Sequence, residues 1–271
     1  MTAPQRTTGP ALGIWQLAWP AIVTNLLASL VGFVGTKVVG SLGAPAVAAV
    51  TTGNRIFFIL QALLMAVTAG TTALVARAWG AGDRDEAEQV TRASLALCAG
   101  IALAVSLPAL IFPHPLASVF RLDPHTIDLA AEFIRWLAPF QIAFAVHLAL
   151  GAALRAAGDT RTPLVIGALT NVVNIVLVYG LVFGLFGMPQ LGVTGAAIAN
   201  GVAFAVGALA FVLLWWRGKL VLGAGASGSW ERARVRRILD IGYPAGLEQL
   251  VWQVGFLVFL WIVSLYGTAP Y

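Results

Sequence analysis

The sequence predicts an all-α protein that crosses a membrane several times, and three observations support this. Hydrophobic residues make up 59% of the 271 residues, charged residues make up only 10%, and the mean hydropathy is +0.89. A soluble domain of this length needs more charge to cover its surface. The apolar residues also gather in segments of about 20 or more, the length that a helix needs to cross a bilayer. Such segments are expected to be helices, because backbone polar groups in lipid must be satisfied internally, and they lack the short alternation of barrel strands.

Seven segments meet this length. In chain order they are Ile14–Val39, Val47–Ala78, Val90–Phe112, Thr126–Leu154, Pro163–Phe186, Val193–Trp216 and Ile238–Tyr266. The stretches that separate them are rich in glycine, proline and charge: "GSLGAP" (40–45), "GAGDRDE" (80–86), "PHP" (113–115), "RLDP" (121–124), "GDTRTP" (158–163), "GMPQLG" (187–192) and "RGKLVLGAGASGS" (217–229).

The chemistry of these stretches agrees with helix ends. Gly158 can end one helix in a left-handed conformation, and Asp159 or Thr162 can cap the next. The acidic residues of "AGDRDEAEQV" (81–90) stand where a helix dipole favours negative charge. Pro139 lies inside the fourth segment and is expected to kink it.

The basic residues predict the orientation. With a cytoplasmic N-terminus, 12 of the 16 lysines and arginines fall on the cytoplasmic side, and Arg121 alone falls in an outer loop. We therefore expect a multi-pass protein of the plasma (inner) membrane with its N-terminus in the cytoplasm. This bias also accounts for the excess of base over acid, 16 against 11, without a nucleic-acid partner.

Motifs for enzymes and metal sites receive little support. The glycine pattern at 223–228 follows a membrane segment and not a strand, so we interpret it as part of a flexible linker and not as a dinucleotide site. His114, His125 and His147 are scattered, and the lone Cys98 allows no disulfide within the chain. We expect no enzyme activity, no cofactor and no metal site.

An internal repeat suggests the domain organisation. A shift of 224 residues places the seventh segment on the first, with Pro20 on Pro244 and Gly43 on Gly267. Six helices would then form one unit, and a second unit would just have begun. The predicted domains are a cytoplasmic tail (1–13), a six-helix N-terminal lobe (14–217), a cytoplasmic linker (218–233) and the first helix of an incomplete C-terminal lobe (234–271).

Polar side chains lie inside nearly every apolar segment. Each one can be an interhelical hydrogen bond, worth about 0.6 kcal/mol, but together they indicate a water-accessible cavity. Arg55 and Glu248 are stronger indications, because an ionisable group inside a span costs at least about 2.5 kcal/mol. Lys37 and Arg135 are nearer to segment ends and are expected to snorkel, and Glu132 can pair with Arg135 on a helix surface. The candidate substrate and ion pathway comprises Asn25, Thr36, Arg55, Gln141, Asn171, Asn174, Tyr179, Asn200, Glu248 and Gln249.

Several stretches resemble the multidrug and toxic compound extrusion (MATE) family, and the resemblance extends over nearly the whole chain from Ile14. They are "LAWPAI" (17–22), "VVGSLGAPAVAA" (38–49), "AGTTALVARAWGAGD" (69–83), "LRAAGDTRTP" with Asn171 and Asn174 (154–175), "GLFGMPQLGVTGAAIAN" (184–200) and "GYPAGLEQLVWQVGFLVF" (242–259).

The resemblance implies two six-helix lobes with a substrate cavity between them, of which this chain would hold one lobe and the first helix of the next. It also implies export of small organic compounds, often cationic, across the lipid bilayer in exchange for H⁺ or Na⁺ by alternating access. Asn171 and Asn174, three residues apart on one helix face, are then expected either to line the cation site or to pin their helix to the first one through Asn25.

The sequence departs from the family at two acidic positions. Many members carry an aspartate in a V-D-T stretch of the first helix, where this chain has Gly35, and some carry an acid at the position of Val178. The resemblance and these two departures together imply that Glu248 is the residue that couples transport to ions. Two alternatives stay open: a flippase for lipid-linked precursors from a related superfamily, which would be expected to have more cationic residues in its cavity, and a truncated remnant that does not transport.

Overall fold

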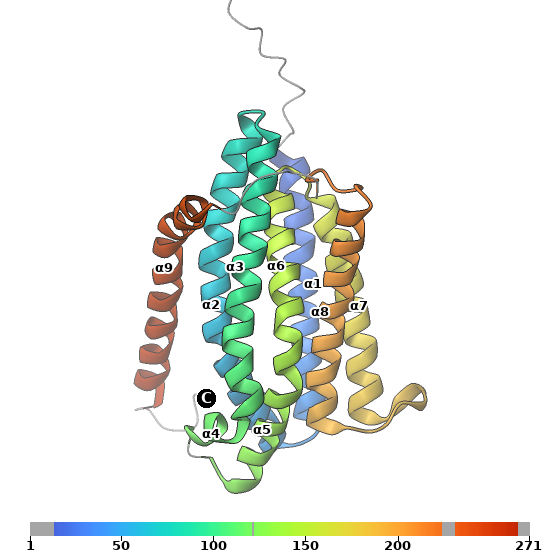
Figure 1. Cartoon of the computed structure of the whole chain (residues 1–271). Helices are drawn as coiled ribbons and strands as arrows, with labels where there is room; N and C mark the ends of the chain where they lie inside the picture. The colour runs from blue at the N-terminus through green and yellow to red at the C-terminus, as the bar shows by residue number, and fades with distance from the viewer. Residues whose placement is uncertain (1–13, 121, 224–230, 265–271) are drawn as a thin grey trace, which may run out of the picture.

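The computed structural model describes residues 14–120, 122–223 and 231–264, and all regular secondary structure in these ranges is helical. The helices run up and down through one bundle (Figure 1). This confirms the predicted all-α fold class. The helices are α1 (Ile14–Gly40), α2 (Ala44–Gly80), α3 (Arg84–Ile111), α4 (Pro113–Ser118), α5 (Pro124–Leu137), α6 (Gln141–Ala156), α7 (Arg161–Phe183), α8 (Gly192–Trp216) and α9 (Arg232–Ser264), with 3₁₀ turns η1 (Ala138–Phe140) and η2 (Leu185–Gly187).

Six segments of the described chain are long and apolar enough to cross a membrane, which supports a multi-pass membrane protein. They correspond to α1, α2, α3, the α5–α6 pair, α7 and α8. The seventh predicted segment forms the helix α9, which is not among these six, and its last predicted residues lie outside the described ranges. The N-terminal tail (1–13), Arg121 and most of the glycine pattern at 223–228 also lie outside them.

The helix ends follow the predicted chemistry. The Asp83 carboxylate accepts a hydrogen bond from the Glu86 N–H at 3.0 Å and caps α3. Gly158 has a φ of +86°, and it is Asp159 that caps α7, by accepting from the Thr162 N–H at 3.0 Å. The "RLDP" stretch contains a further cap, since the Asp123 carboxylate accepts from both the N–H and the hydroxyl of Thr126.

Two proline-containing stretches behave differently from each other. Pro139 interrupts the fourth segment as predicted, because η1 separates α5 from α6 there. The "PHP" stretch, in contrast, does more than separate two helices, since it begins the six-residue helix α4 with Pro113 in its first turn. A proline is well suited to that position, because its missing N–H needs no partner there.

The core of the bundle combines large apolar side chains with close helix approaches. Phe133 and Phe211 are almost completely buried. A methyl group added at Gly53 would overlap the Phe133 ring, and one added at Gly201 would overlap the Phe140 ring. The two glycines therefore let α5 and η1 pack directly against α2 and α8.

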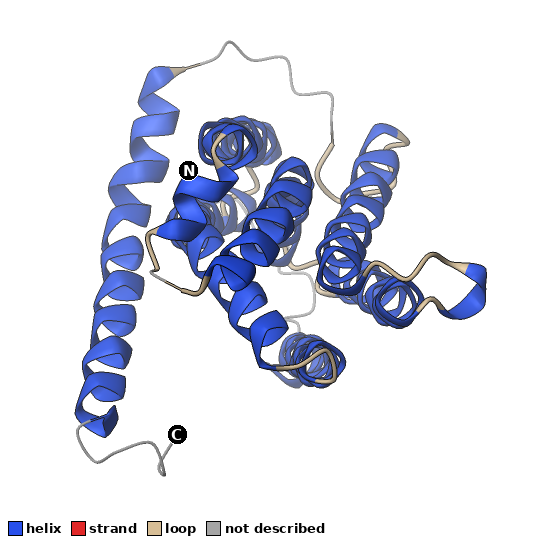
Figure 2. Ribbon diagram, turned by 90° about the horizontal axis from the view of Figure 1, so that it is seen from below, coloured by secondary structure: helices blue, strands red, loops and turns tan. Residues whose placement is uncertain are grey.

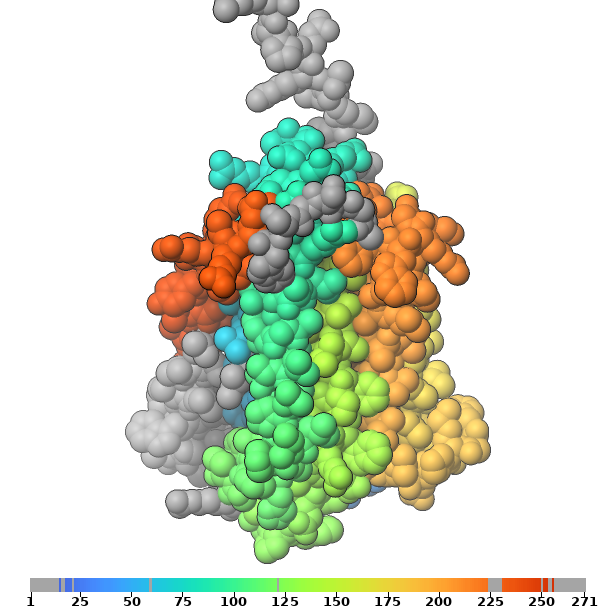
Figure 3. Space-filling model, viewed as in Figure 1, coloured from blue at the N-terminus to red at the C-terminus, as the bar shows by residue number. Residues whose placement is uncertain are grey.

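We call the end of the bundle that carries residues 81–83 and 218–223 the linker end, and the opposite end, with residues 41–43 and α4, the far end (Figure 1). On the face shown in Figure 3, α3 runs from one end to the other between α9 on one side and α6 and α8 on the other. Viewed along the bundle, α9 is seen along its length on the outside, so it is inclined to the other helices (Figure 2).

Helix α9 docks on α2 and α3 through its first turns. Arg234, Ile238 and Gly242 follow one another at four-residue intervals and are buried. Gly242 lies directly against the Ala66 carbonyl and Ile238 against Gly70, so small residues let the α2 and α9 backbones meet.

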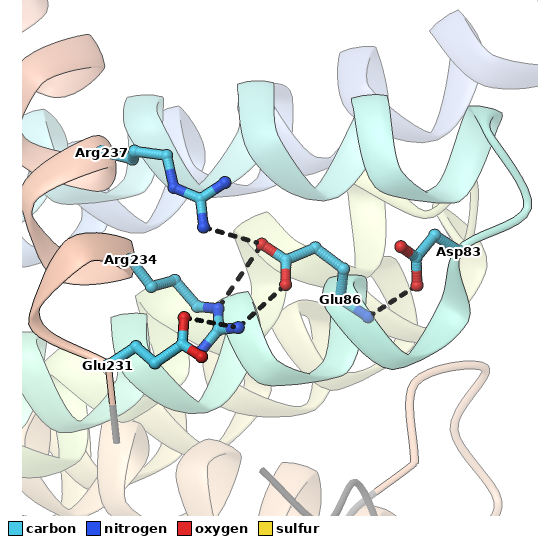
Figure 4. A network of polar contacts seen from close by, with 5 residues as sticks. All are labelled: Asp83, Glu86, Glu231, Arg234 and Arg237. Carbon is cyan, nitrogen blue, oxygen red and sulfur yellow. Dashed lines mark hydrogen bonds and ion pairs between the residues drawn. The ribbon is translucent and has the colours of Figure 1, made fainter. Parts of the chain in front are cut away.

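A polar network closes this contact at the linker end (Figure 4). Arg234 Nη2 lies 2.9 Å from Glu86 Oε2 on α3, and its side chain is only 7% exposed. Arg237 Nη2 lies 3.5 Å from the other Glu86 oxygen, and Glu231 lies 3.5 Å from Arg234. In addition, the Gly223 N–H donates to Glu88 Oε1 at 2.7 Å. The start of α3 therefore holds both the linker and α9.

Candidate functional site

Polar side chains from four helices surround a cavity of about 300 Å³, which we call the central cavity. They are Thr36 of α1, Thr51 and Asn54 of α2, Asn174 of α7 and Asn200 of α8. All of them lie in the half of their helix that is nearer the far end. The remaining wall is apolar, formed by valines with Phe133 and Ala196.

A hydrogen bond between two asparagines lies at the wall of this cavity. Asn174 Nδ2 donates to Asn200 Oδ1 at 3.3 Å, which links α7 to α8. Asn174 is only 8% exposed, yet one amide pair leaves further donors and acceptors of both side chains unused. Thr36 and Asn54 form no hydrogen bond within the described residues. Both side chains are exposed, so their polar groups can bond to water or to a ligand in the cavity.

A second cavity of about 190 Å³, which we call the aromatic cavity, adjoins the first and shares Asn54 and Asn200 with it. It adds the amides of Gln61 and Gln141. Its remaining wall is largely aromatic, with the rings of Phe57, Phe140, Phe144 and Phe204. Together, the two cavities offer amide edges beside flat apolar surfaces, the combination that binds organic molecules in proteins.

The central and aromatic cavities bring together four of the residues predicted from the sequence: Thr36, Gln141, Asn174 and Asn200. Asn171, one turn from Asn174, is half-buried and lines neither cavity. Glu248 is exposed and Gln249 half-buried on α9, and they too are outside both linings.

Asn25 lies in a different place, and this contradicts the pairing with the asparagines of α7. It lines a separate cleft at the linker end, together with Arg155, Thr160 and Pro163. Because α1 and α7 run parallel, both from the linker end to the far end, residue 25 lies level with the beginning of α7, and Asn174 lies about 16 Å further along at 1.5 Å per residue. Asn174 therefore bonds to Asn200 and not to Asn25.

On α2, the polar residue that lines both cavities is Asn54, whereas the sequence suggested Arg55. Arg55 is half-buried and lines neither the central nor the aromatic cavity, since adjacent helical residues point about 100° apart. The signal that identifies the lining residues is the spacing of Thr51, Asn54 and Gln61, which places all three on one face. Tyr179 also lies outside both linings.

None of the described residues that line the central cavity has an ionisable side chain. Gly35 and Val178, which occupy the two positions where the family resemblance suggests an acid, both line it. No group of three or more histidine, cysteine, aspartate or glutamate side chains suited to a metal ion occurs in the described part of the chain. The polar groups that the described residues present to this cavity are neutral hydroxyls and amides.

Comparison with known proteins agrees with the fold. Residues 20–180 match the MatE family model. The chain is 32% identical over 261 residues to a probable multidrug resistance protein NorM of Thermotoga maritima, which covers 94% of this chain and 55% of that protein. It is 24% identical over 267 residues to an uncharacterized transporter, YisQ, of Bacillus subtilis, with 98% of this chain and 59% of that protein covered. The chain thus spans about half the length of the relatives it matches.

Solved structures show the same architecture. A MOP superfamily transporter from Pyrococcus furiosus aligns with a TM-score of 0.80 at 25% identity, covering 89% of this chain and 53% of that one. A multidrug resistance MATE family transporter, described in an outward-facing conformation, aligns with a TM-score of 0.76 at 26% identity over 89% of this chain and 53% of that one. Because the family model matches more than half of the residues, the chain belongs to the multidrug and toxic compound extrusion (MATE) family.

Proposed function

We propose that the chain is part of a secondary active transporter that exports small organic compounds, often cationic, in exchange for H⁺ or Na⁺ by alternating access. Membership of the MATE family and the likeness to multidrug resistance proteins support this function. The observation that carries it is the meeting of Thr36, Asn54, Asn174 and Asn200 from four apolar helices around one cavity.

A second helical unit of similar size is proposed to complete the substrate pathway. The relatives are about twice as long as this chain, and Thr36 and Asn54 are exposed although they belong to membrane helices. Exposed polar groups of this kind need water or a protein surface in front of them. The missing surface would come from a second lobe, with the N-terminus and the linker end on the cytoplasmic side of the inner membrane.

The proposed coupling residue is Glu248. The described residues that line the central cavity include no carboxylate, so we assign the exchange of H⁺ or Na⁺ to an acid in another part of the protein. Glu248 lies on α9, which the sequence repeat equates with the first helix of the second lobe. In the full-length protein, Glu248→Gln is expected to abolish export driven by a pH or sodium gradient. Unchanged gradient-driven export would exclude Glu248 as the coupling residue.

The cavity itself is tested by binding and export of ethidium, a fluorescent organic cation. Asn174→Ala is expected to weaken binding to the purified chain about tenfold and to lower export from cells that express the full-length protein, since the substitution removes an amide contact and leaves Asn200 without its partner. The matched control is Asn171→Ala, an equal change one turn away on α7 outside both cavity linings.

The two asparagine variants separate the proposed site from a purely structural role. If both lower binding equally, or if Asn174→Ala fails to fold, the Asn174–Asn200 pair serves helix packing. If the unmodified chain binds no ethidium, the proposed substrate site is wrong. Binding without export by the chain alone is expected, because alternating access requires the second lobe.

A further inference from the structure

A groove of about 650 Å³ lies at the far end of the bundle, away from the central cavity. It runs between the end of α3, the start of α4 and one side of α5. Leu110, Trp136 and Pro139 form much of its apolar wall, and Glu132 and Arg135 are charged residues that line it. We call it the α3–α5 groove.

The surroundings of the α3–α5 groove place it where lipid meets water. The membrane-spanning part of α3 ends at Ile111, so the groove lies at the boundary of the apolar belt. Next to the groove, Ile111 is 62% exposed and Phe112 is 57% exposed, and Trp136 in its wall is 47% exposed. Large exposed apolar residues together with tryptophan and arginine are typical of a membrane interface. The wall of the groove therefore faces acyl chains.

The two charges in the groove are free to bind a ligand. Glu132 and Arg135 are three residues apart on α5, a spacing that commonly gives an ion pair. Both are exposed, and within the described residues no ion pair joins them to each other or to a third group. The nearby His114 differs, because its Nε2 lies 3.3 Å from the Asp128 carboxylate. The groove thus offers one carboxylate and one guanidinium beside an apolar wall.

We propose that the α3–α5 groove binds one zwitterionic phospholipid with a primary ammonium, that is, phosphatidylethanolamine. The Arg135 guanidinium binds the phosphate, since its donors match phosphate oxygens in a bidentate geometry. The Glu132 carboxylate accepts from the ammonium, and the acyl chains lie along Leu110 and Trp136. An anionic lipid satisfies Arg135 but places no cation beside Glu132, so charge complementarity selects the zwitterion. This proposal does not depend on transport.

The test measures lipid binding to the purified 271-residue chain in detergent by native mass spectrometry, with phosphatidylethanolamine, phosphatidylglycerol and phosphatidylcholine as probes. The unmodified chain is expected to bind phosphatidylethanolamine about tenfold more tightly than phosphatidylglycerol. Arg135→Gln should weaken the binding of both at least tenfold. Glu132→Gln should remove the preference between them, because the neutral amide has no negative charge to repel the anionic headgroup or to attract the ammonium.

Lys37→Gln is the matched control, since Lys37 is an exposed basic residue in the last turn of α1 at the same end of the bundle. It should leave the lipid preference unchanged. The buried thiol of Cys98 should stay protected from maleimide in every variant, which shows that the bundle is folded.

Three results would overturn the proposal. Equal affinity of the unmodified chain for all three lipids would make the groove an ordinary lipid-facing surface. An equal effect of Arg135→Gln and Lys37→Gln would show a non-specific charge effect. Tight binding of phosphatidylcholine, whose headgroup has no N–H donor, would remove the role of Glu132 as an acceptor.

Discussion

Replacing Glu86 with glutamine is expected to release α9 from the bundle. The Glu86 carboxylate is the shared acceptor of Arg234 at 2.9 Å and Arg237 at 3.5 Å, and the Arg234 side chain is only 7% exposed (Figure 4). In the Glu86→Gln variant, the Arg234 guanidinium stays buried without its main counter-charge. This is the costly way to break an ion pair, because the desolvation of the remaining charge is no longer offset.

The magnitude follows from how well each group is buried. Removing one partner of a fully buried pair costs about 3–5 kcal/mol. Glu86 is 28% exposed, and Glu231 stays 3.5 Å from Arg234 and takes over part of the pairing. We therefore expect a cost of about 2 kcal/mol in the docking of α9, below the range for full burial. Since about 1.4 kcal/mol is a factor of ten, the undocked population should rise about 30-fold.

Maleimide labelling of Ile238→Cys measures this population, because residue 238 is fully buried in the docked state. Cys98→Ser removes the native thiol, and both changes are present in every variant, so their own effects cancel in the ratio of rates. The labelling rate should rise about 30-fold in Glu86→Gln. In the matched control Arg236→Gln it should change less than about twofold, because Arg236 is 84% exposed and its pairing with Asp240 at 3.7 Å is open to solvent. Equal rates in the two variants would show that the Glu86 carboxylate does not hold α9 in place.

Two further predictions concern the stability of the bundle, measured by thermal unfolding of the purified chain. Gly53→Ala should destabilise the bundle by about 1–3 kcal/mol, because the added methyl overlaps the buried Phe133 ring. The control Gly35→Ala should be tolerated, because its added methyl meets open space. Equal melting temperatures of the two variants would show that the Phe133 ring can move. The hydrogen bonds from Thr126, its hydroxyl first, hold the pKa of the Asp123 carboxylate below its ordinary value of 3.8. A carboxylate whose pKa is lower in the folded than in the unfolded state stabilises the fold above its unfolded-state pKa. This stabilisation is lost as the pH falls through the folded-state pKa. Asp123→Ala should therefore lower the melting temperature more at pH 7 than at pH 2, and the same loss at both values would assign the effect to packing.

Local chemistry made the helices predictable. The capping roles of Asp83 and Asp159 and the break at Pro139 depend on neighbours within a few residues, so the sequence contains all the information they need. Hydropathy located the six membrane-spanning segments for the same reason, because the cost of placing polar backbone and side chains in lipid is a property of each segment.

The candidate site was predicted only in part. The sequence identified Thr36, Gln141, Asn174 and Asn200 as polar residues in apolar helices, and the structure places them around two adjoining cavities. It did not distinguish Asn54 from Arg55, because that choice depends on how α2 is rotated towards α5 and α7. The rotation is fixed by contacts such as that of Gly53 with Phe133, which join residues far apart in the chain.

The long helices and their place in a membrane could be predicted from the sequence, since they follow from local hydrogen bonding and the cost of moving polar groups into lipid. The short helix α4 and the meeting of polar groups from different helices required the three-dimensional structure. Asn174 is paired with Asn200 and not with Asn25, because the parallel register of α1 and α7 places Asn25 level with the beginning of α7, about three turns before Asn174. Such a register arises from packing along whole helices, and no single residue encodes it.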